Sequence, residues 1–263
     1  MEVVNFSVGN RIVAFNILNI LLTEKFDNAQ TSVPSEDASF LGIKDFMGVP
    51  TPIYDLGIAM NKQSTQKTNQ VLIDILHKGE KEHAHWLDLL EDAIGNKQVF
   101  SQPTDPIQTE FGKWYDTFNS QNVDLIDVLQ KMQAPRQQLF NAASQVIALN
   151  NDGETQKALQ LLTQERNGSL ATIKRLFETA REHVKASYKP VTVFTTIDGR
   201  QPSLGFVVDN VEDSLHVEDE EIRELKDLEV HTGAIDGRVK NMIIGLITTA
   251  GKNSLLLKPE AFL

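Results

Sequence analysis

The sequence of 263 residues contains no cysteine, and this absence removes several kinds of chemistry. A disulfide scaffold, a zinc site built from thiolates and a cysteine nucleophile all require that residue. Basic side chains are also in the minority, because 25 lysines and arginines stand against 36 acidic residues and leave a net charge of −11. Nucleic-acid binding generally needs a basic surface that meets the phosphates, so we expect no nucleic-acid partner.

Long apolar runs are missing as well. The longest are Ile17–Leu22 and Met242–Ile247, well short of the roughly 20 residues of a membrane helix. The first residues, Met1–Asn5, show no basic stretch followed by an apolar core, so they do not resemble a signal peptide. These features predict a cytoplasmic protein without membrane insertion.

Motifs of catalysis are absent too. The sequence has neither a G-x-S-x-G nucleophile elbow nor a glycine-rich phosphate loop. Carboxylates are plentiful, but no local spacing singles out an acid–base pair. We therefore expect no enzymatic activity and no cofactor.

The two ends of the chain have the pattern of β-strands. A strand, a turn at Gly9-Asn10 and a second strand are predicted over Phe6–Phe15. Val191–Ile197 and Leu204–Val208 form a second predicted pair, rich in β-branched residues. A third hairpin is predicted from Met242–Thr248 and Leu255–Leu257, with its turn at Ala250–Asn253. Val49–Tyr54 contains two prolines, which cannot donate to a ladder, so we predict an edge or bulged strand there.

The middle of the chain is helical in pattern. From about Ser64 to Ser187, apolar residues recur at intervals of three and four. Breaks divide this stretch into four predicted helical segments, of which the last three are Ile107–Phe118, Val123–Leu149 and Glu154–Ser187. Pro135 is expected to kink or restart the third segment. Four helices with short connections predict an antiparallel four-helix bundle.

These patterns predict an α+β protein in which a helical domain interrupts a β domain. Neither β-rich end alone has enough paired strands for a sheet core, whereas together they have a typical domain size. The predicted parts are residues 1–60 and 189–263 for the discontinuous β domain, and residues 61–188 for the inserted bundle.

The β-rich ends resemble the CheW family of chemotaxis coupling proteins. Gly42–Leu56 is similar to the family pattern G-V-I-N-L-R-G-x-V-I-P-V-I-D-L. Phe6–Gly9 resembles the opening F-x-L-G, and Gly205–Val211 resembles G-L-V-V-D-x-V. Ile244–Leu246 and Leu255–Leu257 follow in the family order.

The resemblance implies a fold of two small five-stranded β-barrels around a shared core. It also implies an adaptor that docks the cytoplasmic tip of a chemoreceptor and the regulatory domain of a CheA-type histidine kinase. Such a protein would be associated with membrane-bound receptor arrays.

One position departs from the family at the loop that contacts partners. The family arginine of N-L-R-G corresponds to Met47, a flexible apolar side chain. If the adaptor role persists, Asp45, Phe46, Met47 and Gly48 are expected at a partner interface, with Phe46 and Met47 exposed. The alternative is that Phe46 and Met47 pack into the core.

The helical middle resembles the CZB domain, a zinc-binding bundle attached to chemoreceptors. His83–Trp86 is similar to the family's H-x-x-W, and Thr109–Trp114 to its C-x-(L/F)-G-K-W. Pro135–Ala142 aligns with P-H-x-x-x-H-x-x-A.

Most of the zinc ligands implied by that resemblance are replaced. His83 is retained, whereas the other ligand positions are Thr109, Arg136 and Phe140. A hydroxyl, a guanidinium and a phenyl ring do not suit a zinc ion, so we expect no metal. Arg136 could instead occupy the former cavity and meet an acid such as Glu110.

Two other functions stay open at this point. One is a ligand- or zinc-responsive sensor bundle that modulates its β host, although His77, His83 and His85 lack the i, i+4 spacing of a metal-binding helix. The other is a structural module that forms a homodimer through a helical face.

Overall fold

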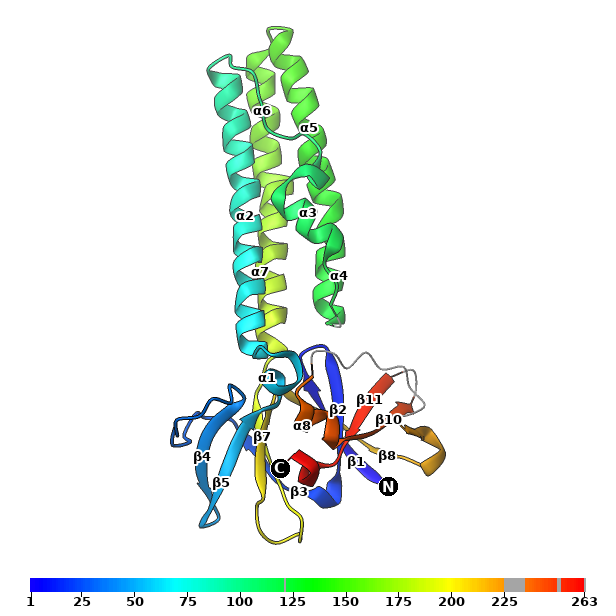
Figure 1. Cartoon of the computed structure of the whole chain (residues 1–263). Coiled ribbons are helices and arrows are strands. Elements are labelled where there is room, and N and C mark those ends of the chain that lie inside the picture. Colours follow the sequence, from blue (N-terminus) through cyan, green and yellow to red (C-terminus); the bar gives the residue numbers. More distant parts are fainter. Residues whose placement is uncertain (121, 225–234, 250–251, 263) are drawn as a thin grey trace. The chain divides into compact units, whose positions relative to one another are not determined.

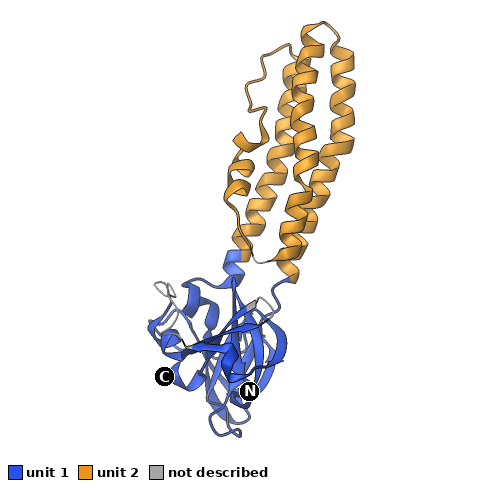
Figure 2. Ribbon diagram, turned by 90° about the vertical axis from the view of Figure 1, so that its right-hand side faces the viewer, with its two compact units in different colours: residues 1–68, 187–263 blue, residues 69–186 orange. Residues whose placement is uncertain are grey.

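The computed structural model describes residues 1–120, 122–224, 235–249 and 252–262. The chain divides into two compact units, which Figure 2 colours separately. Unit 1 consists of residues 1–68 and 187–263, and unit 2 of residues 69–186. That the helical stretch folds independently, with the bounds 61–188, stays a prediction.

Unit 1 contains two β-sheets, and each takes strands from both ends of the chain (Figure 1). The first sheet has the order β8-β1-β2-β11-β10-β9. Its strands are β1 (Glu2–Val8), β2 (Arg11–Asn16), β8 (Asn210–His216), β9 (Ile222–Glu224), β10 (Ile243–Thr249) and β11 (Lys252–Leu257). The second sheet has the order β3-β6-β7-β5-β4. Its strands are β3 (Ile20–Lys25), β4 (Phe40–Phe46), β5 (Val49–Asp55), β6 (Val191–Thr195) and β7 (Leu204–Val208).

The three predicted hairpins are confirmed as antiparallel pairs, β1 with β2, β6 with β7, and β10 with β11. In the last pair Lys252 and Asn253, which we had placed in the turn, belong to β11, and residues 250–251 lie outside the described part. Two parallel pairs, β2 with β11 and β5 with β7, also join the ends of the chain.

Of the two alternatives predicted for the proline-containing strand, the edge position is wrong, and the pair that it forms with β4 does contain a register shift, which lies in β4 between Phe40 and Gly42. β5 pairs with β4 on one side and with β7 on the other. Phe46 and Val49 flank a two-residue turn, so the antiparallel alternation puts Pro50 and Pro52 at positions whose nitrogens face away from β4. On that far side β7 pairs only with residues 53–55. The prolines therefore interrupt no ladder.

Apolar residues cover both faces of each sheet, in the alternation that strands impose. One core lies between the sheets and includes Phe15 of β2 and Phe206 of β7, whose rings stack with centroids 6.0 Å apart. The opposite face of the first sheet carries a smaller cluster with Ala14 and Leu256. The opposite face of the second sheet carries a cluster that includes Phe194.

The second sheet is curled, since β4 at one edge contacts β3 at the other edge through a side-chain ion pair and contacts the segment after β3 through a backbone bridge. Lys44 of β4 forms an ion pair with Glu24 of β3. Thr31, which follows β3, bridges to Ile43 of β4. Five strands were expected in each sheet, and the first sheet has six because the three-residue β9 extends it beyond β10.

Short helices complete unit 1. α1 (Leu56–Asn61) and α8 (Gly237–Met242) contribute buried residues to the core between the sheets. The described residues of unit 1 include the 3₁₀ turns η1 (Ile17–Asn19), η4 (Asp219–Glu221) and η6 (Pro259–Phe262).

Helices build unit 2. Their bounds are α2 (Thr65–Gly95, which begins in unit 1), η2 (Pro106–Gln108), α3 (Glu110–Thr117), α4 (Val123–Lys131), α5 (Gln133–Asn151), α6 (Thr155–Glu165), the π-turn η3 (Arg166–Leu170) and α7 (Ala171–Ala186). α6, η3 and α7 follow one another without interruption, and α4 leads into α5 across Met132. The restart near Pro135 is confirmed, because this residue lies in the first turn of α5.

The four predicted helical segments differ greatly in length. α2, α4 with α5, and α6 with α7 are long, whereas the segment predicted over Ile107–Phe118 is a helix of only eight residues, α3, preceded by the turn η2. Among the described residues, no helix combines the length and the apolar composition that crossing a bilayer requires.

Candidate functional site

The tip of the β4–β5 hairpin contains the residues predicted to contact a partner. Met47 and Gly48 both have positive φ, +55° and +76°, as the central residues of a type I′ turn require. The backbone N–H of Gly48 donates to Asp45 Oδ1 at 3.0 Å, which closes the turn. Asp45, Met47 and Gly48 are exposed, and 68% of Met47 is accessible to solvent.

Phe46, in contrast, is buried, so the expectation that both apolar residues are exposed is wrong for this one. Its ring stacks on that of Phe194, with centroids 3.8 Å apart and planes 7° from parallel. Phe46 is the last residue of β4 and points to the face that carries Ile53 and Val207. Met47 is in the turn itself, where that alternation ends. The candidate contact surface is therefore Asp45, Met47 and Gly48, with Phe46 supporting it from below.

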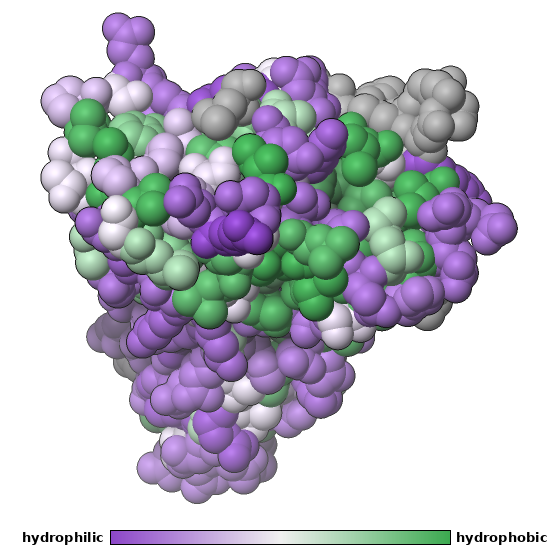
Figure 3. Space-filling model, turned by 90° about the horizontal axis from the view of Figure 1, so that it is seen from below, coloured by the Kyte–Doolittle hydropathy of each residue, from purple (hydrophilic) through white to green (hydrophobic). Residues whose placement is uncertain are grey.

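Further apolar side chains are exposed on unit 1. Ile17 and Leu18 of η1 are exposed, and the hydrogen bond from Thr196 N to Asn19 O brings Ile197, also exposed, next to them. Figure 3 looks onto a face of the molecule where apolar side chains form a continuous area bordered by hydrophilic ones. The apolar run Ile17–Leu22 was visible in the sequence, but its pattern did not predict which of its residues are buried and which are exposed.

In unit 2 the four positions aligned with zinc ligands come together. The Arg136 Nε–H donates to His83 Nε2 at 2.9 Å, and Arg136 Nη2 donates to the carbonyl oxygen of Pro106 at 3.0 Å. The Thr109 hydroxyl donates to the same carbonyl at 2.9 Å. The Phe140 ring lies edge-on to His83, with centroids 6.0 Å apart.

These four residues do not fit a zinc ion. The guanidinium of Arg136 donates to the only imidazole nitrogen that could face a metal, and a cation there opposes a second cation. The Thr109 hydroxyl is used as the N-cap of α3, where it accepts from Gly112 N at 2.9 Å. Within the described part of the chain, no three His, Cys, Asp or Glu side chains gather into a possible metal site.

The protonation state of His83 follows from its surroundings. Burial is the main cause that lowers the pKa of this imidazole to about 4, and the Arg136 charge adds to it. The ring is therefore neutral near pH 7, and because Nε2 accepts, Nδ1 carries the proton and donates to Gly79 O at 2.6 Å. Burial likewise lowers the pKa of Arg136. Both imidazole nitrogens are therefore engaged within the core, Nδ1 by Gly79 O and Nε2 by Arg136.

Glu110, named above as an example of an acid that Arg136 could meet, does not contact it. Glu110 is the first residue of α3 and its exposed carboxylate pairs with Lys78. The acid whose charge acts on Arg136 is Glu82. The two carboxylate oxygens of Glu82 accept from the backbone N–H groups of Glu110 and Phe111, at 2.8 and 2.9 Å. The start of α3 is thus held to α2 by Glu82, and η2 is held to α5 by Arg136.

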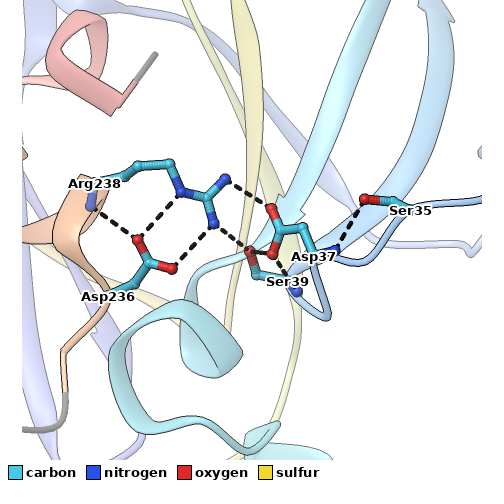
Figure 4. Close-up of polar contacts among 5 residues, drawn as sticks. All are labelled: Ser35, Asp37, Ser39, Asp236 and Arg238. Carbon is cyan, nitrogen blue, oxygen red and sulfur yellow. Dashed lines mark hydrogen bonds and ion pairs between the residues drawn. The ribbon is translucent and has the colours of Figure 1, made fainter.

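A charged cluster in unit 1 had no sequence signal (Figure 4). Arg238 forms ion pairs with Asp37 at 2.7 Å and with Asp236 at 3.1 Å. Its guanidinium also lies over the rings of Tyr54 and Phe262. Burial raises the pKa of Asp37, but hydrogen bonds from Arg238 and Ser39 outweigh it and lower the pKa to about 2. This cluster ties the segment before β4 to α8.

Comparison with known proteins adds little to this geometry. No model of a known protein family matches the chain, and no curated protein matches its sequence. Among solved structures, the chain is similar to the scaffolding protein TtCheW from Thermoanaerobacter tengcongensis, with 11% sequence identity and a TM-score of 0.42. The alignment covers 98% of this chain and 83% of that one. At this level of likeness, no conclusion rests on the match.

Proposed function

We propose that this chain is a non-enzymatic adaptor, similar to CheW, in bacterial chemotaxis-type signal transduction. It would couple chemoreceptors to a CheA-type histidine kinase through protein contacts. The proposal is supported by the order of the family-like segments, which fall on β1, β4 with β5, β7, β10 and β11 of two sheets with a common core. Its site of action would be the cytoplasm, at arrays of membrane-bound receptors.

The observation that carries the proposal is the conformation and exposure of Met47. A left-handed backbone costs a residue with a side chain on the order of 1–2 kcal/mol, and glycine would avoid this cost. An exposed thioether chain gives no compensating burial within the folded chain. A binding partner that covers Met47 would supply that burial. We assign the contact to Asp45, Met47 and Gly48.

The proposal includes the finer fold assignment. Each sheet of unit 1 would correspond to one small barrel of the CheW-like domain, interrupted by residues 61–188. Unit 2 would be a CZB-like four-helix bundle in which one of the four helices, α3, is much shorter than the others. Because Arg136, Thr109 and Phe140 do not suit zinc, the bundle would act as a scaffold and the zinc-responsive alternative is not proposed.

Binding measurements with two defined partners test this function. Isothermal calorimetry of the full chain would use the cytoplasmic tip of a chemoreceptor and the regulatory domain of a CheA-type kinase, both from the same organism. We expect binding to at least one, and a loss of tenfold or more in affinity for Met47→Asp. Val99→Asp is the matched control, since Val99 is an exposed apolar loop residue of unit 2.

Two results would contradict the proposal in different ways. If the unaltered chain binds neither partner, the adaptor function is wrong. If it binds and Met47→Asp keeps the affinity and melting temperature of the original, the hairpin tip is not the contact. A lower melting temperature for Met47→Asp would assign the residue to folding instead.

A further inference from the structure

The surface of α5 differs from the rest of unit 2 because it has no exposed charge. Its 19 residues include a single charged side chain, Arg136, and that one is buried. In comparison, nine of the 31 residues of α2 and six of the 16 residues of α7 are charged. A long solvent-facing helix of an acidic protein normally carries charges, whereas the centres of protein interfaces are depleted of them.

Five exposed residues of α5 form a stripe whose residue types have a symmetric order, and Gln133, Gln137, Ser144 and Asn151 are exposed as well. Ala134, Gln138, Asn141, Gln145 and Ala148 are all exposed and follow one another at intervals of four, three, four and three. Such spacing keeps side chains on one helix face, as in a coiled-coil seam. The order Ala-Gln-Asn-Gln-Ala reads the same in both directions. The first four of these residues line a surface hollow whose wall includes Glu165 of α6.

We propose that this stripe is the contact surface for a second copy of the chain, with the two α5 helices antiparallel. A two-fold axis at Asn141 would place Ala134 opposite Ala148 of the other copy, and Gln138 within one residue, about 1.5 Å along the helix, of Gln145. Each amide has donors and an acceptor, so facing amides satisfy one another. An interface between identical surfaces must be self-complementary, which the symmetric stripe is.

The absence of exposed charge on this stripe allows two copies of the same chain to meet there. Two molecules of net charge −11 repel each other, and pairing through α2 or α7 would bring together helices rich in charge. The α5 stripe removes this repulsion locally. Alanine at both ends of the stripe also allows the helices to approach closely.

The carboxylate of Glu165 adds an acceptor at this surface. It is more than nine-tenths buried and accepts from Ser169 Oγ and from Gln138 Nε2. An ionised carboxylate has about four acceptor positions. An amide N–H from the facing stripe can use one that remains.

Single cysteines test the pairing and its direction, since the natural chain has none to interfere. Oxidation of Asn141→Cys should give a covalent dimer, because the two residues would face each other on the axis. Ala134→Cys alone should not, because in antiparallel helices its two copies lie about 21 Å apart along the axis. A mixture of Ala134→Cys and Ala148→Cys chains should cross-link. Glu178→Cys, exposed on α7, is the control that should stay monomeric.

A charge variant tests the same surface in solution. Asn141→Asp would place two carboxylates face to face and should weaken the dimer at least tenfold in sedimentation equilibrium. The hydrogen bond that Gln137 donates to the Asn141 side chain can persist, so the helix should stay folded. Gln66→Glu adds the same charge on α2 and should leave the dimer unchanged.

The outcomes separate the possibilities. A natural chain that sediments as a monomer at about 100 µM overturns the proposal, even if Asn141→Cys captures a different protein. Cross-linking of Ala134→Cys to itself overturns the antiparallel arrangement. Equal cross-linking of Asn141→Cys and Glu178→Cys overturns the specificity of the surface.

Discussion

The contact between His83 and Arg136 allows a quantitative test by a double-mutant cycle. Arg136→Leu leaves His83 Nε2 buried without a donor, at a cost of about 1–3 kcal/mol, while Pro106 O keeps the Thr109 hydroxyl. His83→Leu leaves a buried guanidinium without one of its acceptors, although Pro106 O still accepts from it, and an unmet hydrogen bond of a charged group costs more than one of a neutral group, here about 3 kcal/mol. The double variant leaves neither group unpaired.

The expected order of unfolding free energies follows from these costs. His83→Leu should be the least stable variant and Arg136→Leu intermediate, and the double variant should be no less stable than Arg136→Leu. The coupling energy should be about 2 kcal/mol. Urea unfolding followed by tryptophan fluorescence is a suitable assay, because Trp86 and Trp114, the two tryptophans of the chain, both belong to unit 2. Additive effects would refute the reasoning.

The same variants have a pH signature. His83 has a pKa of about 4 in the folded chain and 6.5 as its ordinary value, so the unfolded state binds the proton more tightly between these limits. The stability that comes from the neutral ring is complete above pH 6.5 and is lost as the pH falls through 4, by up to about 3 kcal/mol. This contribution should be absent in His83→Leu. An unchanged pH profile in that variant would show that another group causes it.

Three further predictions concern both units. Burial raises the pKa of Asp209 from its ordinary value of 3.8 to about 6. The folded state therefore binds this proton more tightly than the unfolded state, and unit 1 loses stability as the pH rises from about 4 through 6. Asp209→Asn should therefore raise the melting temperature in calorimetry more at pH 7 than at pH 4, and an equal gain would exclude the carboxylate as the cause. Met47→Gly should stabilise unit 1 by about 1 kcal/mol, since glycine tolerates the left-handed turn. The same change should weaken partner binding. A loss of stability in this variant would show that the Met47 side chain serves the fold. A chelator should not change the melting temperature of the natural chain. The triple variant Thr109→Cys, Arg136→His, Phe140→His should show a melting temperature that zinc raises and a chelator lowers again. No zinc binding by the triple variant would argue against the CZB resemblance.

The type and order of the elements were largely predictable, because periodicity depends on local sequence. β-branched alternation indicated the β1–β2, β6–β7 and β10–β11 pairs, and spacing by three and four indicated the helices. The position of β5 inside its sheet was not predictable. Two prolines in a strand usually indicate an edge strand. In β5 the register of its pairing with β4 places both proline nitrogens on the other side of the strand, where β7 pairs only with residues 53–55.

The side-chain partners in unit 2 show a second limit. The motif alignment brought His83, Thr109, Arg136 and Phe140 to one place, and the structure does the same. It could not show that Arg136 donates to His83 and Pro106, because a guanidinium can reach any acceptor within several ångströms. Glu110 was the nearest acid in the motif, but its position at the start of α3 directs it to Lys78. Arg238 pairs with a residue about 200 positions away, which no local pattern can reveal.

Phe46 and Met47 are adjacent apolar residues, and their hydrophobicity alone does not predict that one is buried and the other exposed. The last residue of a strand continues the alternation of its sheet, so Phe46 points into the cluster that contains Phe194. The next residue enters a turn with positive φ, which ends the alternation and turns its side chain to solvent. Because Phe46 pairs with Val49, the turn holds only Met47 and Gly48, and both must take the positive φ of a two-residue turn. The exposure of Met47, on which the proposed function rests, is therefore set by the length of the β4–β5 turn. Inserting one glycine after Gly48 should change the presentation of Met47 and weaken partner binding while Phe46 stays buried, which binding and calorimetry can measure together.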